Sequence, residues 1–242
     1  MTAAPRRPLI AIAVLAAAGA SFAAQTESSV DKRLKQASDA FQDVMRIPDK
    51  SIPRDLMNKA VCIVVIPDLK KGAFVFGGKY GRGFASCREG SQRQFAAPAA
   101  IRIEGGSFGL QLGGSSTDVV LLVMNQRGMN RLLSDKFTLG GEAAVAAGPV
   151  GRNTSATTDA MLTAEILSWS RSRGVFVGLS LEGATLRPDN GENQKLYGKP
   201  VGNKAILTSA MPTPARARVF VASLNRFVYV RPRTDKHAHS IH

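Results

Sequence analysis

Apolar residues near the start of the chain recur every three or four positions. This spacing places them on one side of a helix, while residues of both charge signs fall on the other side. The pattern predicts an amphipathic helix over residues 30–45 that packs on a core, with Ser28 or Ser29 as its N-cap. A second, short helix is expected over residues 55–60. The apolar positions of the first helix are Val30, Leu34, Ala37, Phe41 and Val44.

From residue 61 onward the pattern changes to short apolar runs separated by glycine-rich segments, which is typical of β-structure. Ile101 and Ile103 alternate with polar neighbours, and residues 119–124 indicate a central strand followed by a short helix through Leu133. The first expected elements are the strand VCIVVIP (61–67), the turn DLKKG (68–72), the strand AFVFGG (73–78), the turn KYGRG (79–83) and the strand FASCRE (84–89).

The third section, residues 136–187, is again expected to be mostly β, with turns at residues 148–151 and 172–174. Residues 159–171 have both helical and alternating spacing, and we assign them to a strand.

The last part of the chain changes character once more. Residues 188–203 are polar and rich in turn residues, so we expect a loop there. Thr213 and Pro214 then form a good N-cap and first-turn pair for a final helix. Taken together, the elements predict an α+β fold: a single domain over residues 28–228 with a curved, mostly antiparallel β-sheet covered by a few helices.

The composition is that of an ordinary globular protein, with 44% hydrophobic and 21% charged residues. Lys and Arg together number 32 against 18 for Asp and Glu, which gives a formal net charge of +14. Such a surface attracts polyanions, namely nucleic acid, anionic lipid or acidic protein. Charge alone does not choose among these partners.

The N-terminus has the pattern of a secretory signal peptide over residues 1–23. Arg6 and Arg7 precede an apolar stretch, and Ser21 and Ala23 supply the small residues that signal peptidase needs for a cut before Ala24. A transmembrane anchor is the alternative, but the apolar stretch is shorter than a usual span. We therefore expect an exported protein, periplasmic or secreted. Because an exported protein rarely meets nucleic acid, we expect no nucleic-acid partner.

The chain has two cysteines, Cys62 and Cys87, and both fall in expected strands. In an oxidising compartment they can form one disulfide. Two buried thiols that act as small apolar side chains are the other interpretation, and the sequence leaves both open. Two cysteines without a nearby histidine make a poor zinc site, so no metal is expected.

Catalytic residues are not evident. Gly105-Gly106-Ser107-Phe108-Gly109 matches the G-x-S-x-G string of hydrolases, but LQLGG follows where that site needs a helix. A serine nucleophile also needs a base, and the three histidines all lie within the last six residues. The carboxylates are scattered and fit no acid/base or metal template. We expect no enzymatic activity and no cofactor.

Four cations are concentrated in the two expected turns: Lys70, Lys71, Lys79 and Arg82. Glycine-rich turns expose backbone N–H groups, which together with these cations can hold phosphate head groups. Two solvated hairpin turns are the equally open alternative. A second basic segment forms the C-terminal tail, residues 229–242.

The order of the motifs resembles the SYLF-domain family from about Leu34 to Ala210. The motifs are VIPDLKKGAFVFGGKYGRG, EGGSFGLQLGGSSTDVVLLVMNQRG, KFTLGGEAAVAAGPVGR, AEILSWSRSRGVFVGLSLEGATLRPD and LYGK.

The resemblance implies non-enzymatic lipid binding. In this family, eukaryotic members prefer phosphoinositides and fungal members also bind actin filaments. For an exported protein the expected ligand is an anionic phospholipid such as phosphatidylglycerol or cardiolipin, bound peripherally at a membrane surface of the cell envelope. The four cations of the two turns match the basic glycine-rich segment of the family and are the preferred contact. An envelope protein with an acidic surface is the alternative partner.

Overall fold

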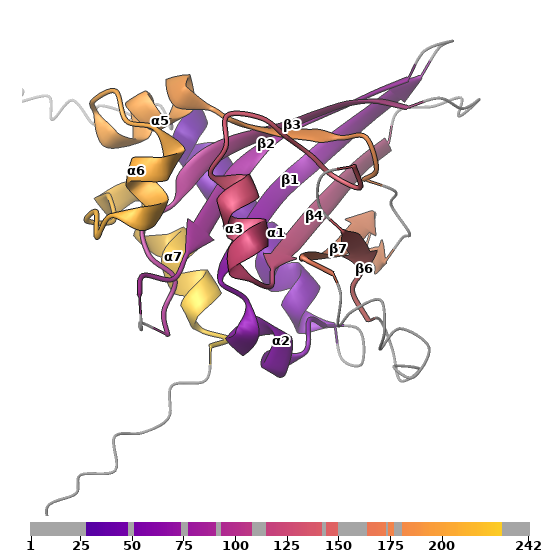
Figure 1. Cartoon of the computed structure of the whole chain (residues 1–242), viewed down its shortest axis with the longest axis horizontal. Coiled ribbons are helices and arrows are strands. Elements are labelled where there is room, and N and C mark those ends of the chain that lie inside the picture. Colours follow the sequence, from indigo (N-terminus) through magenta and orange to yellow (C-terminus); the bar gives the residue numbers. More distant parts are fainter. Residues whose placement is uncertain are drawn as a thin grey trace, which may run out of the picture.

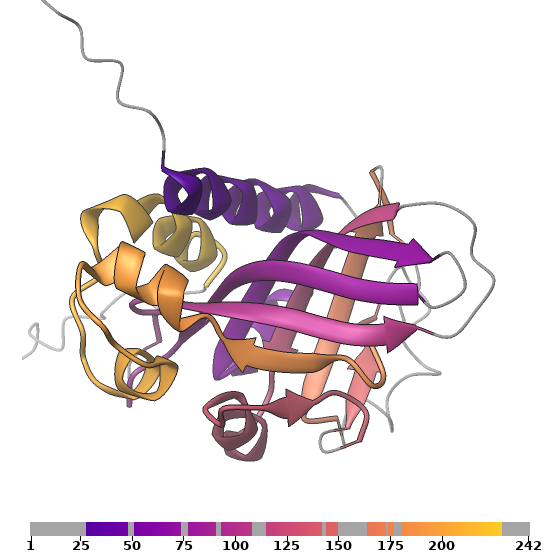
Figure 2. The ribbon, with the colours of Figure 1, turned by 90° about the horizontal axis from the view of Figure 1, so that it is seen from above.

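One curled β-sheet runs through the protein, and helices pack on both of its faces (Figures 1 and 2). The structure is a computed structural model that describes residues 28–47, 51–73, 77–90, 93–107, 115–141, 144–149, 164–172, 174–176 and 181–228. The strands are β1 (Cys62–Ala73), β2 (Gly77–Cys87), β3 (Ala99–Ser107), β4 (Ser115–Val123), β5 (Phe137–Thr138), β6 (Val145–Ala147), β7 (Ile166–Ser172), β8 (Val175–Phe176) and β9 (Thr185–Pro188).

The order of the strands in the sheet is β5-β9-β3-β2-β1-β4-β7-β6, with β8 paired to the outer part of β7. Every described pair is antiparallel except β6 with β7. The predicted α+β fold with a curved, mostly antiparallel sheet is confirmed. The helices are α1 (Ser29–Arg46), α2 (Arg54–Lys59), α3 (Gln126–Leu132), α5 (Asn190–Tyr197), α6 (Asn203–Thr208) and α7 (Arg218–Asn225), the last preceded by the 3₁₀ turn η2 (Ala215–Ala217).

Each face of the sheet buries its own apolar cluster. On the face that we call the α1 face, residues such as Ile63, Val65 and Phe84 pack against α1 and α7. On the opposite face, called the α3 face, Val64, Ile66 and their neighbours pack against α3, α6 and the loop before β9. Figure 2 shows α1 and α3 on opposite sides of the sheet. This arrangement follows from the period-two alternation of a strand, which sends successive side chains to opposite faces.

The first helix forms as its spacing predicts. Its apolar residues are buried, including Leu34 and Phe41, which are at most 2% exposed. Ser28 accepts a hydrogen bond from the Asp31 N–H and is therefore the N-cap of α1. Among the described residues, no helix is both long enough and apolar enough to cross a membrane.

The two predicted turns at residues 68–72 and 79–83 are wrong, because both segments lie within the long strands β1 and β2. The glycines that suggested a turn instead allow neighbouring strands to pack closely. A Cβ atom at Gly81 would lie 2.7 Å from Cγ2 of Ile66, and one at Gly83 would lie 2.0 Å from the Val65 carbonyl oxygen. The predicted strand 73–78 falls partly on residues 74–76, which lie outside the described residues.

The predicted loop at residues 188–203 is also wrong, because it contains α5 and the start of α6. The local signals for α5 are present in the sequence. Asp189 accepts a hydrogen bond from the Glu192 N–H as the N-cap, and Gly198 ends the helix in the left-handed conformation with a φ of 71°.

Several other predictions agree with the described residues, while residues 150–151 of the predicted turn and 159–163 of the predicted strand lie outside them. The ambiguous segment forms β7 at residues 166–172, where the Trp169 indole is buried and donates to the Pro149 carbonyl oxygen at 3.3 Å. The final helix begins as η2 directly after Pro214, and Phe220 and Leu224 bury its inner face. The predicted N-cap Thr213 is wrong, because Pro214 occupies the N-cap position and no side chain caps the helix there. Residues 1–23 and 229–242, expected to be a signal peptide and a basic tail, lie outside the described residues.

Candidate functional site

The β1–β2 hairpin brings three of the four predicted site residues together. Near its end Lys70 pairs with Tyr80 and Lys71 with Lys79, before the two last pairs, Gly72 with Gly78 and Ala73 with Gly77. We call residues 70–73 and 77–80 the hairpin end. In Figures 1 and 2 this end of the sheet lies away from the helices, at the upper right in Figure 1.

A β-bulge at Asp68 sets the direction of the hairpin end. Asp68 has a φ of 55°, and the register of β1 shifts at this point against both of its neighbouring strands. The Asp68 N–H donates to Oδ1 of Asp118 on β4 at 3.0 Å. Burial raises the pKa of Asp118, while this hydrogen bond and the charge of Arg171 act in the opposite direction. The bulge therefore depends on a partly buried carboxylate.

On the α3 face of the hairpin end, two lysines stand opposite each other. Lys79 is only 8% exposed, and its side chain follows the same face as Leu69 and Gly81. Burial lowers the pKa of Lys79, and burial together with the charge of Lys79 lowers the pKa of Lys71. The two lysines therefore place two positive charges close together on this face of the hairpin end.

On the other face of the hairpin end, a cation and an aromatic ring are accessible. The Lys70 side chain is 73% exposed and lies 3.9 Å from the Asp68 carboxylate. Tyr80, directly opposite, is 48% exposed, which is unusual for a large aromatic side chain. The nearby acid on this face, Glu104, forms an ion pair with Arg102 at 2.6 Å. Sequence analysis did not single out Tyr80, although an aromatic residue between two cations was a usable signal.

The fourth predicted residue, Arg82, takes part in a different arrangement. Its Nε donates to Oδ2 of Asp189 at 2.6 Å, and its guanidinium lies 3.6 Å from the Glu192 carboxylate. Burial opposes the charge of Arg82, but the hydrogen bond and the charge of Asp189, with that of Glu192, raise its pKa. Arg33 of α1 pairs with the same Glu192. Arg82 thus ties the sheet to α5 and α1 and is not available at the hairpin end.

At the other end of the hairpin, Cys62 and Cys87 are joined by a disulfide. They occupy facing positions in the β1–β2 register, and both are buried. Of the two interpretations that the sequence left open, the structure has the bridged one. Ser107 is the last residue of β3, and the residues after it, 108–114, lie outside the described residues.

Comparison with known proteins places the chain in a family. The family model described as Ysc84, a Las17-binding protein actin regulator, matches residues 104–227, about half of the chain. This chain belongs to the Ysc84 family. The membership confirms the resemblance to the SYLF-domain family. The Ysc84 match begins within β3, so the β1–β2 hairpin precedes the matched region.

Individual relatives extend the Ysc84 likeness over more of the chain. The human SH3 domain-containing YSC84-like protein 1 is 30% identical over 206 residues, which are 83% of this chain and 60% of the relative. LAS seventeen-binding protein 3 of Saccharomyces cerevisiae is 33% identical over 190 residues, which are 76% of this chain and 40% of the relative. This chain thus spans about 60% or less of the length of these relatives. The name of the yeast relative describes a binding protein.

Proposed function

We propose that this protein binds anionic phospholipid membranes peripherally, without enzymatic chemistry, through the hairpin end. The observation that carries the proposal is the joint presence of Lys70, Lys71, Lys79 and the exposed Tyr80 at one end of a rigid sheet. Each cation near an anionic bilayer contributes roughly 1 kcal/mol. The exposed Lys70 and the half-buried Lys71 therefore support reversible attachment, whereas Lys79 is largely buried. Tyrosine side chains favour the membrane interface, where the ring is apolar and the hydroxyl remains in water.

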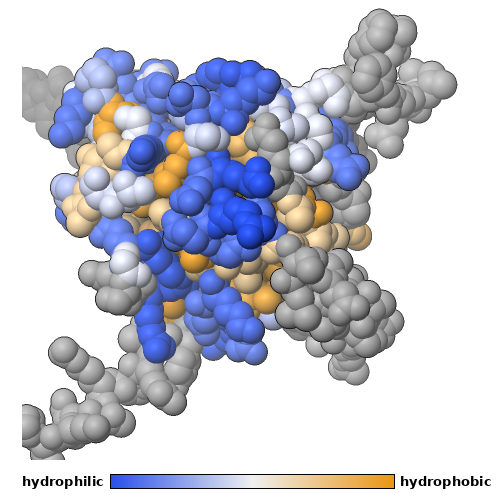
Figure 3. Space-filling model, in the orientation of Figure 1, coloured by the Kyte–Doolittle hydropathy of each residue, from blue (hydrophilic) through white to orange (hydrophobic). Residues whose placement is uncertain are grey.

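The face of the protein shown in Figure 3 is consistent with attachment to a membrane through charged side chains and a small number of apolar ones. Figure 3 shows a mainly hydrophilic face over α3, with apolar residues in smaller areas between the polar ones. Because the hairpin end lies away from the helices, it can approach a flat surface before they do (Figure 1). We include in the proposal that residues 1–23 direct export. A disulfide is the form expected of paired cysteines in an oxidising compartment.

A protein partner is the second candidate function. The family description and the name of the yeast relative both refer to binding of Las17, a protein. Because this chain spans only part of that relative, the binding activity of the whole relative is not assigned to the shared segment. For this chain the alternative is a protein with an acidic surface.

Flotation with protein-free vesicles separates these candidates. Vesicles of phosphatidylcholine alone and of phosphatidylcholine with phosphatidylglycerol are compared, using the double variant Lys70→Glu, Lys71→Glu and the matched control Lys199→Glu, Lys204→Glu. The control has the same change in charge at exposed positions next to and within α6. We expect the wild type and the control to float with anionic vesicles and the hairpin variant to remain in the dense fraction.

Two results contradict the proposal at different levels. If the wild-type protein does not float with anionic vesicles, lipid binding itself is wrong and the protein-partner candidate is favoured. If the wild type floats and the hairpin variant floats equally well, lipid binding stands but the hairpin end is not its site.

A further inference from the structure

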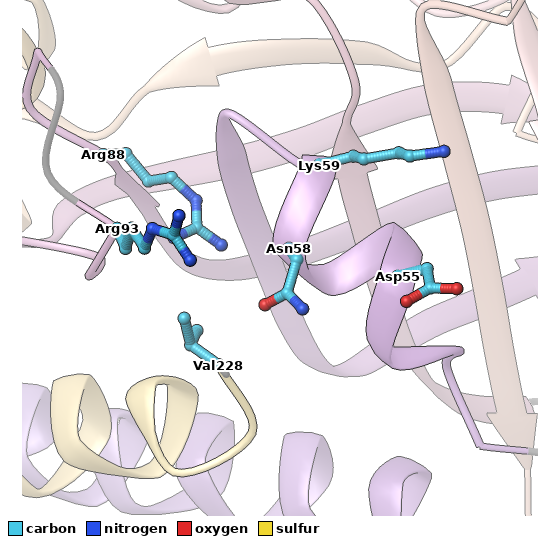
Figure 4. Close-up of a pocket in the computed structure, with 6 residues that line it drawn as sticks. All are labelled: Asp55, Asn58, Lys59, Arg88, Arg93 and Val228. Atoms are coloured by element: carbon cyan, nitrogen blue, oxygen red, sulfur yellow. The ribbon is translucent and has the colours of Figure 1, made fainter. Parts of the chain in front are cut away.

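A basic pocket lies at the opposite end of the β1–β2 hairpin from the proposed membrane contact. Its volume is about 430 Å³. Lys71 lies nine positions after Cys62 in β1, which corresponds to about 30 Å at the usual rise of a strand. A flat membrane that touches the hairpin end therefore does not reach this pocket in the same orientation of the protein, and a membrane lipid in the pocket would require a second orientation. The lining residues are Asp55, Asn58, Lys59, Arg88, Arg93 and Val228 (Figure 4).

Arg88 is held in the pocket wall by contacts that leave its charge uncompensated. Its Nε donates to the Ala60 carbonyl oxygen at 2.8 Å and its Nη2 to the Met57 carbonyl oxygen at 2.7 Å. The guanidinium also stacks over the Phe95 ring, 4.2 Å from its centre. Arg88 directly follows the disulfide-bonded Cys87, so its backbone is fixed as well. Among the described residues, no carboxylate lies within ion-pair distance of Arg88.

Arg93 adds a second guanidinium beside the first. Figure 4 shows the two groups side by side at the pocket, facing the Asn58 carboxamide. Burial, followed by the charge of Arg93, lowers the pKa of Arg88. Arg93 is exposed and likewise forms no ion pair with any described residue. The one acid in the lining, Asp55, lies farther along α2, with Asn58 between it and the arginines in Figure 4.

We propose that this pocket binds a phosphate group, with Arg88 and Arg93 as the recognising pair. Two adjacent guanidinium groups present planar sets of donors that match the several acceptor oxygens of a phosphate, and the dianion offsets their mutual repulsion. Lys59 of α2 also lines the pocket, but its ammonium group points away from the two arginines in Figure 4. The volume exceeds that of the phosphate alone, so the ligand class is a phosphate ester of a small polar alcohol. The source is either a soluble ester or a lipid head group.

The test measures binding of glycerol 1-phosphate to the full-length protein by titration calorimetry at fixed ionic strength, with glycerol and sodium chloride as reference titrants. Arg93→Gln removes one guanidinium from an exposed position and leaves the structural contacts of Arg88 in place. The matched control is Arg54→Gln, an exposed arginine at the start of the same helix α2 that does not line the pocket. We expect Arg93→Gln to weaken binding at least tenfold and Arg54→Gln to leave it unchanged.

The result is independent of the membrane proposal. The hairpin variant Lys70→Glu, Lys71→Glu should bind glycerol 1-phosphate like the wild type, whether or not it binds vesicles. If Arg93→Gln also reduces flotation with phosphatidylglycerol vesicles, the phosphate that the pocket binds is that of a lipid head group. If flotation is unchanged while glycerol 1-phosphate binding falls, the phosphate is that of a soluble ester. The proposal is overturned if the wild type binds glycerol 1-phosphate no better than chloride, or if both arginine variants bind it equally to the wild type.

Discussion

Arg82 donates its Nε hydrogen to the carboxylate of Asp189, a residue 107 positions away in the chain. Asp189 is 4% exposed and uses its other carboxylate oxygen to cap α5 through the Glu192 N–H. One buried carboxylate thus joins the middle of β2 to the start of α5. Because of this contact, Arg82 stabilises the fold and is not available to bind a ligand at the surface, although it lies in a glycine-rich segment.

Removing the Arg82 side chain should destabilise the protein. Arg82→Ala leaves the buried Asp189 and Glu192 carboxylates with less compensating charge, and we expect a loss of about 2 to 3 kcal/mol in the free energy of unfolding, since breaking one side of a buried pair is costly. Urea denaturation followed by circular dichroism measures this loss. Lys70→Ala, at an exposed position, should change stability by less than about 0.5 kcal/mol. Equal stability of the two variants would contradict the role given to Arg82.

Removing the disulfide should lower stability without changing the fold. The bridge between Cys62 and Cys87 closes a loop across a sequence separation of 25 residues. In the chain-entropy account, a loop of this length contributes about 3 kcal/mol. The double variant Cys62→Ser, Cys87→Ser should show this loss in urea denaturation, and a reducing agent should lower wild-type stability by a similar amount but leave the variant unaffected. A wild type insensitive to reduction, with two thiols that alkylate freely, would mean that no bridge forms.

The buried carboxylate of Asp118 should make stability depend on pH. Because its pKa is raised in the folded state, the folded protein binds the proton more tightly than the unfolded chain does. Ionisation of Asp118 therefore costs stability above its folded pKa, and this cost is relieved as the pH falls through that value. Asp118→Asn retains an oxygen acceptor for the Asp68 N–H and should be more stable than the wild type at pH 7.

The pH series supplies the control for this prediction. The difference in unfolding free energy between Asp118→Asn and the wild type should shrink as the pH is lowered toward 4. Asp118→Ala, which lacks the acceptor, should be less stable than Asp118→Asn at every pH. A difference between wild type and Asp118→Asn that does not vary with pH would show that the carboxylate is not the titrating group.

A tryptophan at the hairpin end should report contact with a membrane. The natural Trp169 is 1% exposed, so its emission is that of a buried indole and provides a constant background. In Tyr80→Trp the added emission should shift to shorter wavelength on addition of anionic vesicles. Val219→Trp, placed at a 68% exposed position on α7, is the matched control and should not shift. A shift in the control alone would assign the contact to the α7 surface.

Local patterns were sufficient to predict the parts of the fold that depend on near neighbours in the chain. The three-and-four spacing of Leu34 and Phe41 predicts α1, and the alternation of Ile101 and Ile103 predicts β3. The hairpin was misassigned because glycine density does not distinguish a turn from the close approach of strands, which is what Gly81 and Gly83 allow. α5 was missed because its polar residues masked the capping signals of Asp189 and Gly198.

The candidate sites were harder to predict, for a different physical reason. The sequence identified Lys70, Lys71 and Lys79 because they are close together in the chain. It could not separate Arg82 from them, since the partner that removes Arg82 lies on α5. The basic pocket was missed entirely. Arg88 is positioned by carbonyl oxygens 28 and 31 residues earlier in the chain, and such contacts leave no spacing pattern.

The disulfide also changes the covalent topology of the molecule. With Cys62 and Cys87 joined, all residues between them form a closed ring that contains both strands of the hairpin and the three lysines at its end. Hydrolysis of any one peptide bond inside this ring opens it but leaves the two pieces attached through sulfur. A protease that cuts after Lys71 or Arg82 would therefore produce a nicked chain of unchanged mass apart from one water, and only reduction would release two fragments.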